Sequence, residues 1–394
     1  MERENKYQMT CLQVHNDYQI AGGETKTAER IADLLESYGI KVIRYYKSNK
    51  SFQNAGYIEK VKIGVYSVFN PKTISEVSEI IKKENVDFAL IHNVMPIISN
   101  SIYQVLIDHN IPVIKYIQNY NLVCLNGALD HGAECERCKK TCWNGVKNAC
   151  YKDSRIYSFI KYLAKKYMDI KYMSKIDAFM PNSEFVKGKH KEFGIREDRM
   201  HVMHNFIDME DIKLNAENFD SYYLYFGRIS REKGVFTAVK AFKKLPQSKL
   251  RIMGTGECEE QLKEAIFDFP NIEYVGSKSG KELVDNIKKA KCVIVPSEWD
   301  EPLPRTILEA YAYGIPVIGA ERGGIPEMIV NGITGYIFSN SVNNLERNIE
   351  RIRDLSIEEY NRMRLDCIKI CRNYYSKDAY YSRFFNCLSY IRVV

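Results

Sequence analysis

The feature that most constrains the fold of this chain is a regular alternation of short apolar runs with longer amphipathic stretches. Each apolar run has the length of a buried strand, and each amphipathic stretch has the length of a helix. In the first pair, residues 9–15 (MTCLQVH) predict a strand, and residues 25–39 predict a helix that ends at Gly39. Strands that alternate with helices usually pair in parallel, so the chain is predicted to be an α/β protein with helices on both faces of its sheets.

The alternation occurs in two series. In the first half, further strands are predicted at 61–68, 86–92, 111–117 and 176–182, and further helices at 70–86 and 182–194, the second capped by Asn182 or Ser183. In the second half, strands are predicted at 222–227, 249–254, 271–276, 291–297 and 315–320. Each half is therefore expected to form a doubly wound, Rossmann-like sheet.

A polar stretch without a sustained period, residues 206–220, predicts the linker between the halves. The predicted domains are residues 1–205, with a Cys-rich insertion at 124–150, and residues 206–375, followed by a C-terminal helix at 376–394 that packs back on the body. Open parallel sheets bind ligands at the carboxyl ends of their strands. Two such domains are expected to face a cleft that holds the active site.

Composition narrows the classes of partner. The 394 residues include 57 Lys and Arg against 50 Asp and Glu, a formal charge of +7. This excess suits a phosphate-bearing ligand or an anionic membrane and falls short of a nucleic-acid-binding protein. The sequence contains no apolar run of about 18 residues, and its N-terminus lacks the pattern of a secretory signal. We therefore expect a cytoplasmic protein, which would lie at the inner face of the cell membrane if it contacts lipid.

The densest motif spans residues 295–338, where Glu301 and Glu309 have an E-x7-E spacing. Arg228 and Lys233 precede it in the segment YFGRISREKGV. Together with their neighbours, these residues resemble the retaining glycosyltransferases of family four, within glycosyl transferases group 1. The resemblance covers nearly the whole chain and implies the GT-B architecture of two Rossmann-like domains. The other matching residues are Gly22, Gly23, Gly254, Gly256, Pro296, Ser297, Ala310, Gly314, Pro316 and Val317.

The chemistry of these residues agrees with a nucleotide-diphospho-sugar donor. The turn from Glu301 to Thr306 opens a helix, and the free N–H groups of a helix N-terminus favour a phosphate. Arg228 and Lys233 follow the first strand of the second half, where they can stabilise negative charge on the leaving diphosphate. These two cations would replace a metal ion, so neither a catalytic metal nor a cofactor is expected.

The resemblance assigns individual roles. It makes Arg228, Lys233 and Glu301 catalytic, with Glu301 orienting the transferred sugar, and it gives Glu309 the ribose hydroxyls of the donor. It also implies that a donor phosphate oxygen removes the proton of the acceptor. The other residues that it assigns to donor binding are Gly22, Gly23, Gln118, Gly227, Gly254, Pro302, Leu303, Pro304, Arg305 and Thr306.

The chain departs from the family pattern at residues 118–120. Many relatives carry a His-Asp-aromatic triplet there, whereas this chain has Gln-Asn-Tyr. Gln118 can hydrogen-bond a sugar but cannot exchange a proton near neutral pH. Either the position only binds the donor sugar, which is the reading we adopt, or the protein has lost part of its activity. Polar residues near the ends of first-half strands are interpreted as structural: His15, His92 and Asn93.

Four cysteines form a local cluster, Cys135-x2-Cys138-x3-Cys142-x7-Cys150. Four thiolates at short spacing can hold a structural zinc ion. The two alternatives are that the four cysteines are reduced free thiols or that they have a redox role. Of these readings, none makes the cluster catalytic.

Residues 154–176 combine Arg and Lys with large apolar residues at helical spacing. A basic amphipathic helix can lie on an anionic leaflet. The alternative is a core helix with a solvated basic face. Family members that build envelope glycans often use lipid-linked acceptors, and this favours peripheral contact of the helix with the membrane.

The sequence thus predicts a metal-independent retaining glycosyltransferase of the hexosyltransferase type. It would move a sugar from a nucleotide-diphospho-sugar to a glycan or lipid-linked glycan, in the synthesis of a cell-surface polysaccharide such as capsule or lipopolysaccharide. A non-catalytic nucleotide-sugar-binding partner and a GT-B nucleotide-sugar epimerase are the alternatives.

Overall fold

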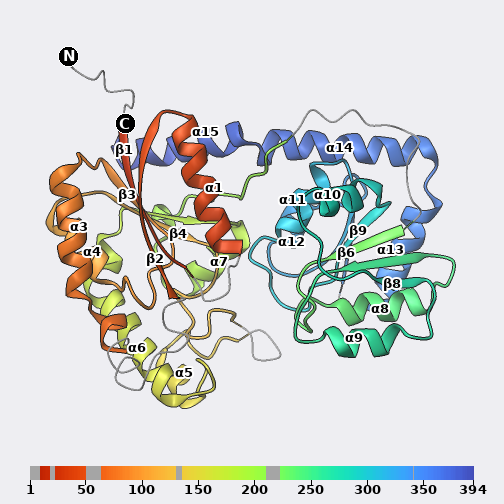
Figure 1. Ribbon diagram of the computed structural model, residues 1–394, viewed down its shortest axis with the longest axis horizontal. Coiled ribbons are helices and arrows are strands. Elements are labelled where there is room, and N and C mark those ends of the chain that lie inside the picture. The colour runs from red at the N-terminus through yellow and green to blue at the C-terminus, as the bar shows by residue number, and fades with distance from the viewer. Residues whose placement is uncertain (1–8, 18–22, 50–63, 130–134, 210–221, 340) are drawn as a thin grey trace. The chain divides into compact units, whose positions relative to one another are not determined.

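The computed structural model describes residues 9–17, 23–49, 64–129, 135–209, 222–339 and 341–394. They form two compact α/β units (Figure 1). The first contains the described residues of Met1–His131, Cys135–Met203 and Tyr381–Val394, and the second contains those of His204–Tyr380. Most of the predicted linker, residues 210–220, lies outside the described residues.

The first unit is built on a five-stranded sheet in the order β2-β1-β3-β4-β5, with every neighbouring pair parallel. The central strands β3 and β4 are buried throughout. The strands are β1 (Met9–Asp17), β2 (Ile40–Ser48), β3 (Phe88–Ile91), β4 (Val113–Ile117) and β5 (Ala178–Pro181). The order reverses between β1 and β3, which is the topological switch point of this sheet.

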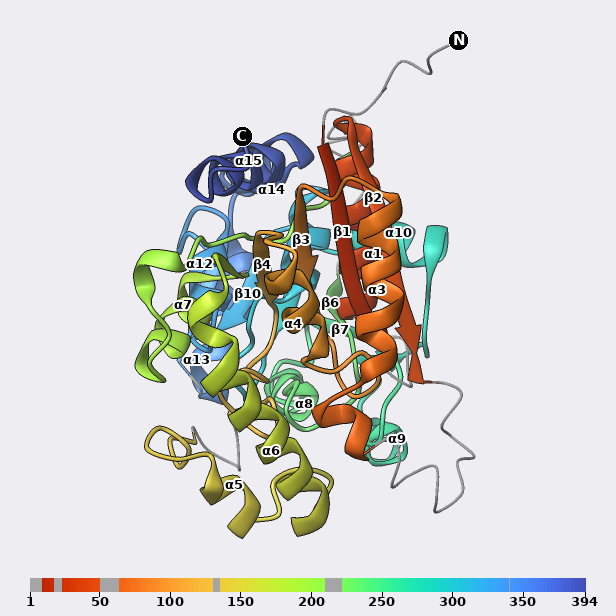
Figure 2. The ribbon, with the colours of Figure 1, turned by 90° about the vertical axis from the view of Figure 1, so that its left-hand side faces the viewer.

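Helices cover both faces of this sheet, with α1 on one and α3 and α4 on the other (Figure 1). Capping fixes where several of them begin: Asn70 accepts from Lys72 N at α3, and Ser183 accepts from Val186 N at α7. The helical segments are α1 (Gly23–Ser37), α3 (Pro71–Lys83), α4 (Ser101–Asp108), α5 (Trp143–Lys147), α6 (Arg155–Lys171), η2 (Met173–Lys175), α7 (Glu184–Glu192) and η3 (Glu197–Arg199). Figures 1 and 2 place α5 and α6 together at the end of the unit away from the C-terminal residues.

One predicted strand of the first half is wrong. Residues 64–68, within the expected strand 61–68, are helical, and the second strand is β2 instead. The apolar pattern did not identify β2 because this strand lies at the edge of the sheet, beside β1. Its polar side chains, such as Arg44, stay exposed at the edge, so the strand lacks the apolar run of a central strand.

The second unit contains a six-stranded parallel sheet in the order β11-β10-β9-β6-β7-β8. Five of these strands are those predicted, whereas the edge strand β11 was not predicted. The strands are β6 (Tyr222–Phe226), β7 (Lys249–Met253), β8 (Ile272–Tyr274), β9 (Cys292–Val295), β10 (Val317–Ala320) and β11 (Gly335–Phe338). The switch point lies between β6 and β9. The predicted fold of two Rossmann-like sheets is thereby confirmed.

The helices of the second unit also lie on both faces of its sheet. α13 packs with α8, and α11 packs with α14, which begins with a capping box of Ser356 and Glu359. The helices are α8 (Val235–Lys243), α9 (Glu259–Ile266), α10 (Gly280–Lys289), α11 (Arg305–Tyr311), α12 (Ile325–Met328), α13 (Val342–Asp354) and α14 (Ile357–Tyr375). In the described part of the chain, each helix is too short or too polar to cross a membrane.

The last helix, α15 (Lys377–Tyr390), starts in the second unit and ends in the first. In the first unit, the Tyr381 ring stacks on Tyr38 with centroids 3.9 Å apart, and Phe384 lies 5.9 Å from Phe88. Phe384 is fully buried. The C-terminal residues thus complete the core of the unit that the N-terminal residues begin.

Candidate active site

The switch point of the second sheet brings together the loop after β6 and the loop after β9. Glu298 N donates to Glu232 O at 2.9 Å and joins the two loops directly. A ligand site is expected at this place in an open parallel sheet, because neighbouring connections diverge to opposite faces and leave a crevice.

A carboxylate and a cation from the two loops form an ion pair at this point. Lys233 Nζ donates to Glu301 Oε1 at 2.5 Å, and Ser297 Oγ donates to the same oxygen at 2.8 Å. The Glu301 side chain is 7% exposed and that of Lys233 is 29% exposed. Lys233 Nζ also lies 5.4 Å from the centroid of the Trp299 ring, within cation–π range.

The backbone around Glu301 is fixed by a close approach of Gly323. This residue has φ +56°, and a Cβ on it would lie 2.1 Å from Glu301 O, so a side chain is excluded. Gly324 N donates to Glu301 O at 2.7 Å, and Gly323 N donates to Asp300 Oδ1 at 3.2 Å. The Glu301 carboxylate is therefore presented from a rigid loop.

Arg228 lies at the carboxyl end of β6 with its side chain 64% exposed. Its nearest charged neighbour is Glu232, at 3.7 Å. Its backbone is held by Tyr225, whose hydroxyl donates to Arg228 O at 2.6 Å, and burial raises the pKa of that hydroxyl. The guanidinium remains accessible to an anion.

Two predicted glycines pack at the ends of neighbouring strands. Gly254, after β7, has φ +142°, and a Cβ on it would lie 1.8 Å from Gly227 O, after β6. This contact allows the two loops to approach each other closely.

The E-x7-E segment continues into α11. Pro302, Leu303 and Pro304 are buried, and the helix begins at Arg305. Glu309, its fifth residue, is 27% exposed and lies 3.7 Å from Arg305 Nε. Arg305 also donates to Phe206 O at 3.4 Å. Thr306 is half-buried at the start of the helix.

The predicted site residues of the first unit lie at the carboxyl end of its own sheet. Gly23 is the first residue of α1, whereas Gly22 lies outside the described residues. Gln118 directly follows β4, and its Nε2 atom is buried without a hydrogen-bond partner among the described residues. An unpaired buried amide is costly, so this atom is a candidate for contact with a ligand.

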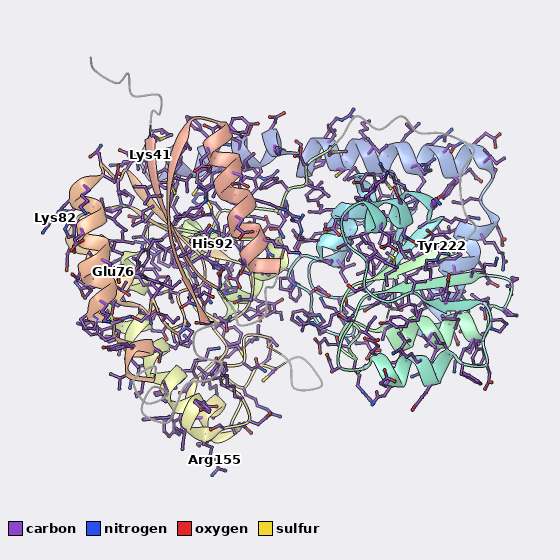
Figure 3. All side chains as sticks on the ribbon, in the orientation of Figure 1. Lys41, Glu76, Lys82, His92, Arg155 and Tyr222 are labelled. Atoms are coloured by element: carbon purple, nitrogen blue, oxygen red, sulfur yellow. The ribbon has the colours of Figure 1, made fainter. Side chains whose placement is uncertain are left out.

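His15 and His92, which the sequence analysis interprets as structural, are both fully buried. His92 Nε2 lies 3.0 Å from Gln13 Nε2, and His15 Nε2 lies 3.0 Å from Thr25 Oγ1. Burial lowers the pKa of His15 to about 4 and that of His92 well below its ordinary value. Both rings are therefore neutral and pack against neighbouring side chains at this edge of the sheet. Figure 3 labels His92 within the first unit.

A pocket of about 340 Å³ opens beside these residues, between the ends of β3 and β4 and the helices α4 and α6. Gln118 lines it, together with Lys115 from β4 and Lys161 from α6. Sequence reasoning missed Lys115, although a lysine inside the apolar strand VIKYI is an identifiable signal. Both sequence interpretations of residues 154–176 place their cations outside, on a membrane or in solvent, whereas the structure turns Lys161 inward to the pocket.

The four clustered cysteines carry free thiols, of which Cys138 is buried and the others half-buried. A hydrogen bond between the thiols of Cys138 and Cys142 lowers the pKa of Cys142 and raises that of Cys138. Among the residues that the structure describes, three or more Cys, His, Asp or Glu side chains are nowhere grouped to hold a metal ion.

Helix α6 exposes an apolar stripe on its outer face. Ile156 and Ile170 are 73% and 70% exposed, and Phe159 and Leu163 lie between them on the same face. Exposed cations flank the stripe, including Arg155, which Figure 3 shows at the periphery of the unit.

The fold is that of a doubly wound α/β protein. The Lys233–Glu301 pair lies at the switch point of its second sheet, where such a protein is expected to bind a ligand. Residues 207–372 match the model of the family described as glycosyl transferases group 1. The matched segment contains the Lys233–Glu301 pair and Glu309.

Curated relatives are similar to part of the chain. The chain is 29% identical over 178 residues to the amylovoran biosynthesis glycosyltransferase AmsK of Erwinia amylovora, covering 41% of this chain and 43% of the relative. It is 33% identical over 138 residues to a lipopolysaccharide 1,2-N-acetylglucosaminetransferase of Salmonella typhimurium, covering 32% and 36%. The matched part of the chain thus spans about two fifths of the length of these relatives.

A solved structure extends the likeness of the fold to both units. Anabaena HepE in complex with UDP and glucose matches with a TM-score of 0.66 and 15% identity, covering 97% of this chain and 99% of that protein.

Proposed function

We propose that the protein is a metal-independent, retaining glycosyltransferase of family four. It transfers a hexose from a nucleotide-diphospho-sugar to a glycan or lipid-linked glycan, in the synthesis of a cell-surface polysaccharide such as capsule or lipopolysaccharide. The observation that carries this proposal is the Lys233–Glu301–Ser297 cluster at the switch point of a glycosyl transferases group 1 segment.

The loops after β6 and β9 are assigned to the donor. Lys233 has three N–H donors and uses one on Glu301, so two remain for diphosphate oxygens. The exposed guanidinium of Arg228 can bind the same diphosphate in a bidentate manner. HepE binds UDP in its solved complex, which supports a nucleotide donor here.

Glu301 is assigned to the transferred sugar. One of its oxygens accepts from Lys233 and Ser297, and the other makes no hydrogen bond within the described residues. That second oxygen can accept from a sugar hydroxyl. Glu309 is assigned to the ribose hydroxyls, with the loop 302–306 and the glycines Gly23, Gly227 and Gly254 allowing close approach of the donor.

In the proposed reaction, the acceptor oxygen bonds to the anomeric carbon as the bond to the diphosphate breaks, on the same face of the sugar. The departing phosphate oxygen takes the acceptor proton. Lys233 and Arg228 stabilise the charge that develops on the diphosphate, which is worth several kcal/mol when donors are preorganised. Glu301 is held in an ion pair and positions the sugar, so it is not required as a base.

The first unit is assigned to the acceptor. Gln118 is the exception, because its buried amide is assigned to the donor sugar. The apolar stripe of α6 with its flanking cations is proposed to contact an anionic membrane from the cytoplasmic side. The named roles of AmsK and the Salmonella enzyme in amylovoran and lipopolysaccharide synthesis support an envelope glycan as the product.

The test is a panel of UDP-, GDP- and ADP-sugars, assayed for thermal stabilisation and for transfer. One donor should stabilise the protein and yield a product whose anomeric configuration, read by NMR, is that of the donor. Lys233→Ala should abolish both effects, while Lys240→Ala, an exposed lysine on α8, should preserve both. An inverted product would disprove retention. Donor binding without transfer, or formation of an epimer, would disprove the proposed activity.

A further inference from the structure

The pocket of the first unit is rich in side chains that recognise sugars and phosphates. Its walls combine apolar surface with carboxamides, a group that can both donate to and accept from hydroxyl groups. Asn93 is already engaged within the protein, because it donates to Asn16 O and Met95 O and accepts from Met95 N. The carboxamides are Asn49, Asn93, Asn100, Gln118, Asn119, Asn121 and Asn126. Tyr103, Tyr151 and Tyr157 add aromatic surface against which a sugar ring can pack.

The charges that line the pocket are mostly positive. Lys115, Lys152, Lys161 and Lys165 face it, against one carboxylate, Glu24. Lys165 forms an ion pair with Asp169, with Nζ and Oδ2 2.7 Å apart. The negative charge of Glu24 raises the pKa of Lys115, against the larger effect of burial. Neither Lys115 nor Lys161 makes an ion pair within the described part of the chain: Lys115 donates to His92 O, and Lys161 donates to Asn121 Oδ1 at 2.9 Å.

Burial makes these two cations unusual. It lowers the pKa of Lys115 and that of Lys161 to about 8 each. Lys161 Nζ also lies 4.3 Å from the centroid of the Tyr151 ring. Lys115 is buried and Lys161 is half-buried, and among the described residues neither has a carboxylate within ion-pair distance. An anionic ligand that pairs with these ammonium groups would offset the cost of desolvating them.

The two faces of α6 connect the pocket to the outside. The inner face contributes Ile160, Lys161, Ala164 and Met168 to the pocket wall, whereas the outer face carries the exposed apolar stripe. A molecule in the pocket is therefore separated by the width of one helix from the surface assigned to the membrane.

We propose that this pocket binds an acceptor sugar that carries a phosphate ester or diphosphate, with Lys161 and Lys115 holding the phosphate and the asparagine carboxamides holding the acceptor sugar, next to Gln118, which is assigned to the donor sugar. This proposal rests on the assignment of the first unit to the acceptor. The phosphate comes either from a soluble sugar phosphate or from the diphosphate of a lipid-linked sugar.

Binding of glucose 1-phosphate, with glucose as the neutral comparison, tests the soluble source by calorimetry. The phosphate ester should bind more tightly than glucose, and Lys161→Met should weaken its binding about 10- to 100-fold, as expected for a lost charged hydrogen bond. Lys82→Met is the matched control, because Lys82 is exposed at the outer side of the same unit (Figure 3). Circular dichroism checks that each variant is folded.

The lipid source is tested with neutral vesicles that contain polyprenyl-diphosphate-linked N-acetylglucosamine, compared with the same vesicles without it. Binding that depends on Lys161 in either arm supports the proposal and identifies the source. Equal binding by wild type and Lys161→Met in both arms overturns it, and so does the absence, in both arms, of any preference for the phosphate-bearing ligand over its phosphate-free comparison. UDP binding, measured in parallel, reports on the donor site, so failure of the proposed function and failure of this inference are distinguishable.

Discussion

Replacing Lys233 by Met tests the central ion pair of the candidate active site. At 2.5 Å and an effective dielectric constant of about 20, two unit charges attract by about 7 kcal/mol. Desolvation of the two groups cancels most of this attraction, but removal of one partner leaves the other charge buried, which costs about 3–5 kcal/mol. Since Lys233 is 29% exposed and water can partly replace it, we expect a loss of about 3 kcal/mol in the free energy of unfolding of the second unit.

The double variant Lys233→Met/Glu301→Gln separates charge from packing. The carboxamide introduced in place of the Glu301 carboxylate would be neutral and could still accept from Ser297, so most of the stability should return. Turnover should fall by on the order of 10² or more in both the single and the double variant, because the leaving diphosphate loses its cation.

Tryptophan fluorescence during urea unfolding provides the assay. The chain has two Trp residues, Trp143 and Trp299. In a Trp143→Phe background, the remaining Trp299 lies beside Lys233 and reports on the second unit. A single variant that loses less than about 1 kcal/mol, or a double variant less stable than the single one, would refute the view that Glu301 is a buried charge requiring its partner.

Three further predictions concern the sugar contact, the metal and the membrane. Gln118→Ala should reduce transfer about two- to tenfold, the effect of one hydrogen bond. Gln118→His should be tolerated; a large gain in its rate, with a new titration near pH 6.5, would instead show that the position exchanges protons. EDTA should leave transfer intact, and abolition with rescue by Mg²⁺ would disprove metal independence; metal analysis of the same preparation tests the zinc alternative for the cysteines, which requires about one zinc per chain. The double variant Ile156→Ser/Ile170→Ser should weaken co-sedimentation with anionic vesicles at least tenfold, since each exposed isoleucine contributes about 1.5 kcal/mol or more when buried in lipid. The control variant Leu365→Ser, at an exposed position on α14, should not weaken it. Equal recovery of the double variant and the control would contradict the membrane contact.

The sequence predicts the central strands well because burial on both faces requires continuous apolar runs, as in β3 and β9. Edge strands such as β2 escape the same reasoning, since exposure at the edge permits polar residues. The loop residues of the second unit could be placed because a motif fixes their spacing. The meeting of Lys233 and Glu301, 68 residues apart, follows from the strand order, which no local pattern reveals.

The pocket of the first unit could not be predicted. It is assembled from the ends of β3 and β4, from α4 and from α6, and the order of these elements in space is a property of the topology. Lys161 shows the difficulty: its helix carries lysines on several faces, and helical spacing does not tell which of them turns inward.

The path of α15 has a consequence for how the protein is made. Residues Tyr381–Val394 belong to the unit formed by residues up to Met203, so a ribosome must synthesise the whole second unit before the first can be completed. A nascent chain would expose the surfaces around Tyr38 and Phe88 throughout that interval, and hydrophobic surface of this kind favours aggregation or chaperone binding. For the same reason, a fragment cut after Met203 would lack part of its own core, and expressing the first unit alone would require residues 381–394 to be fused back to it.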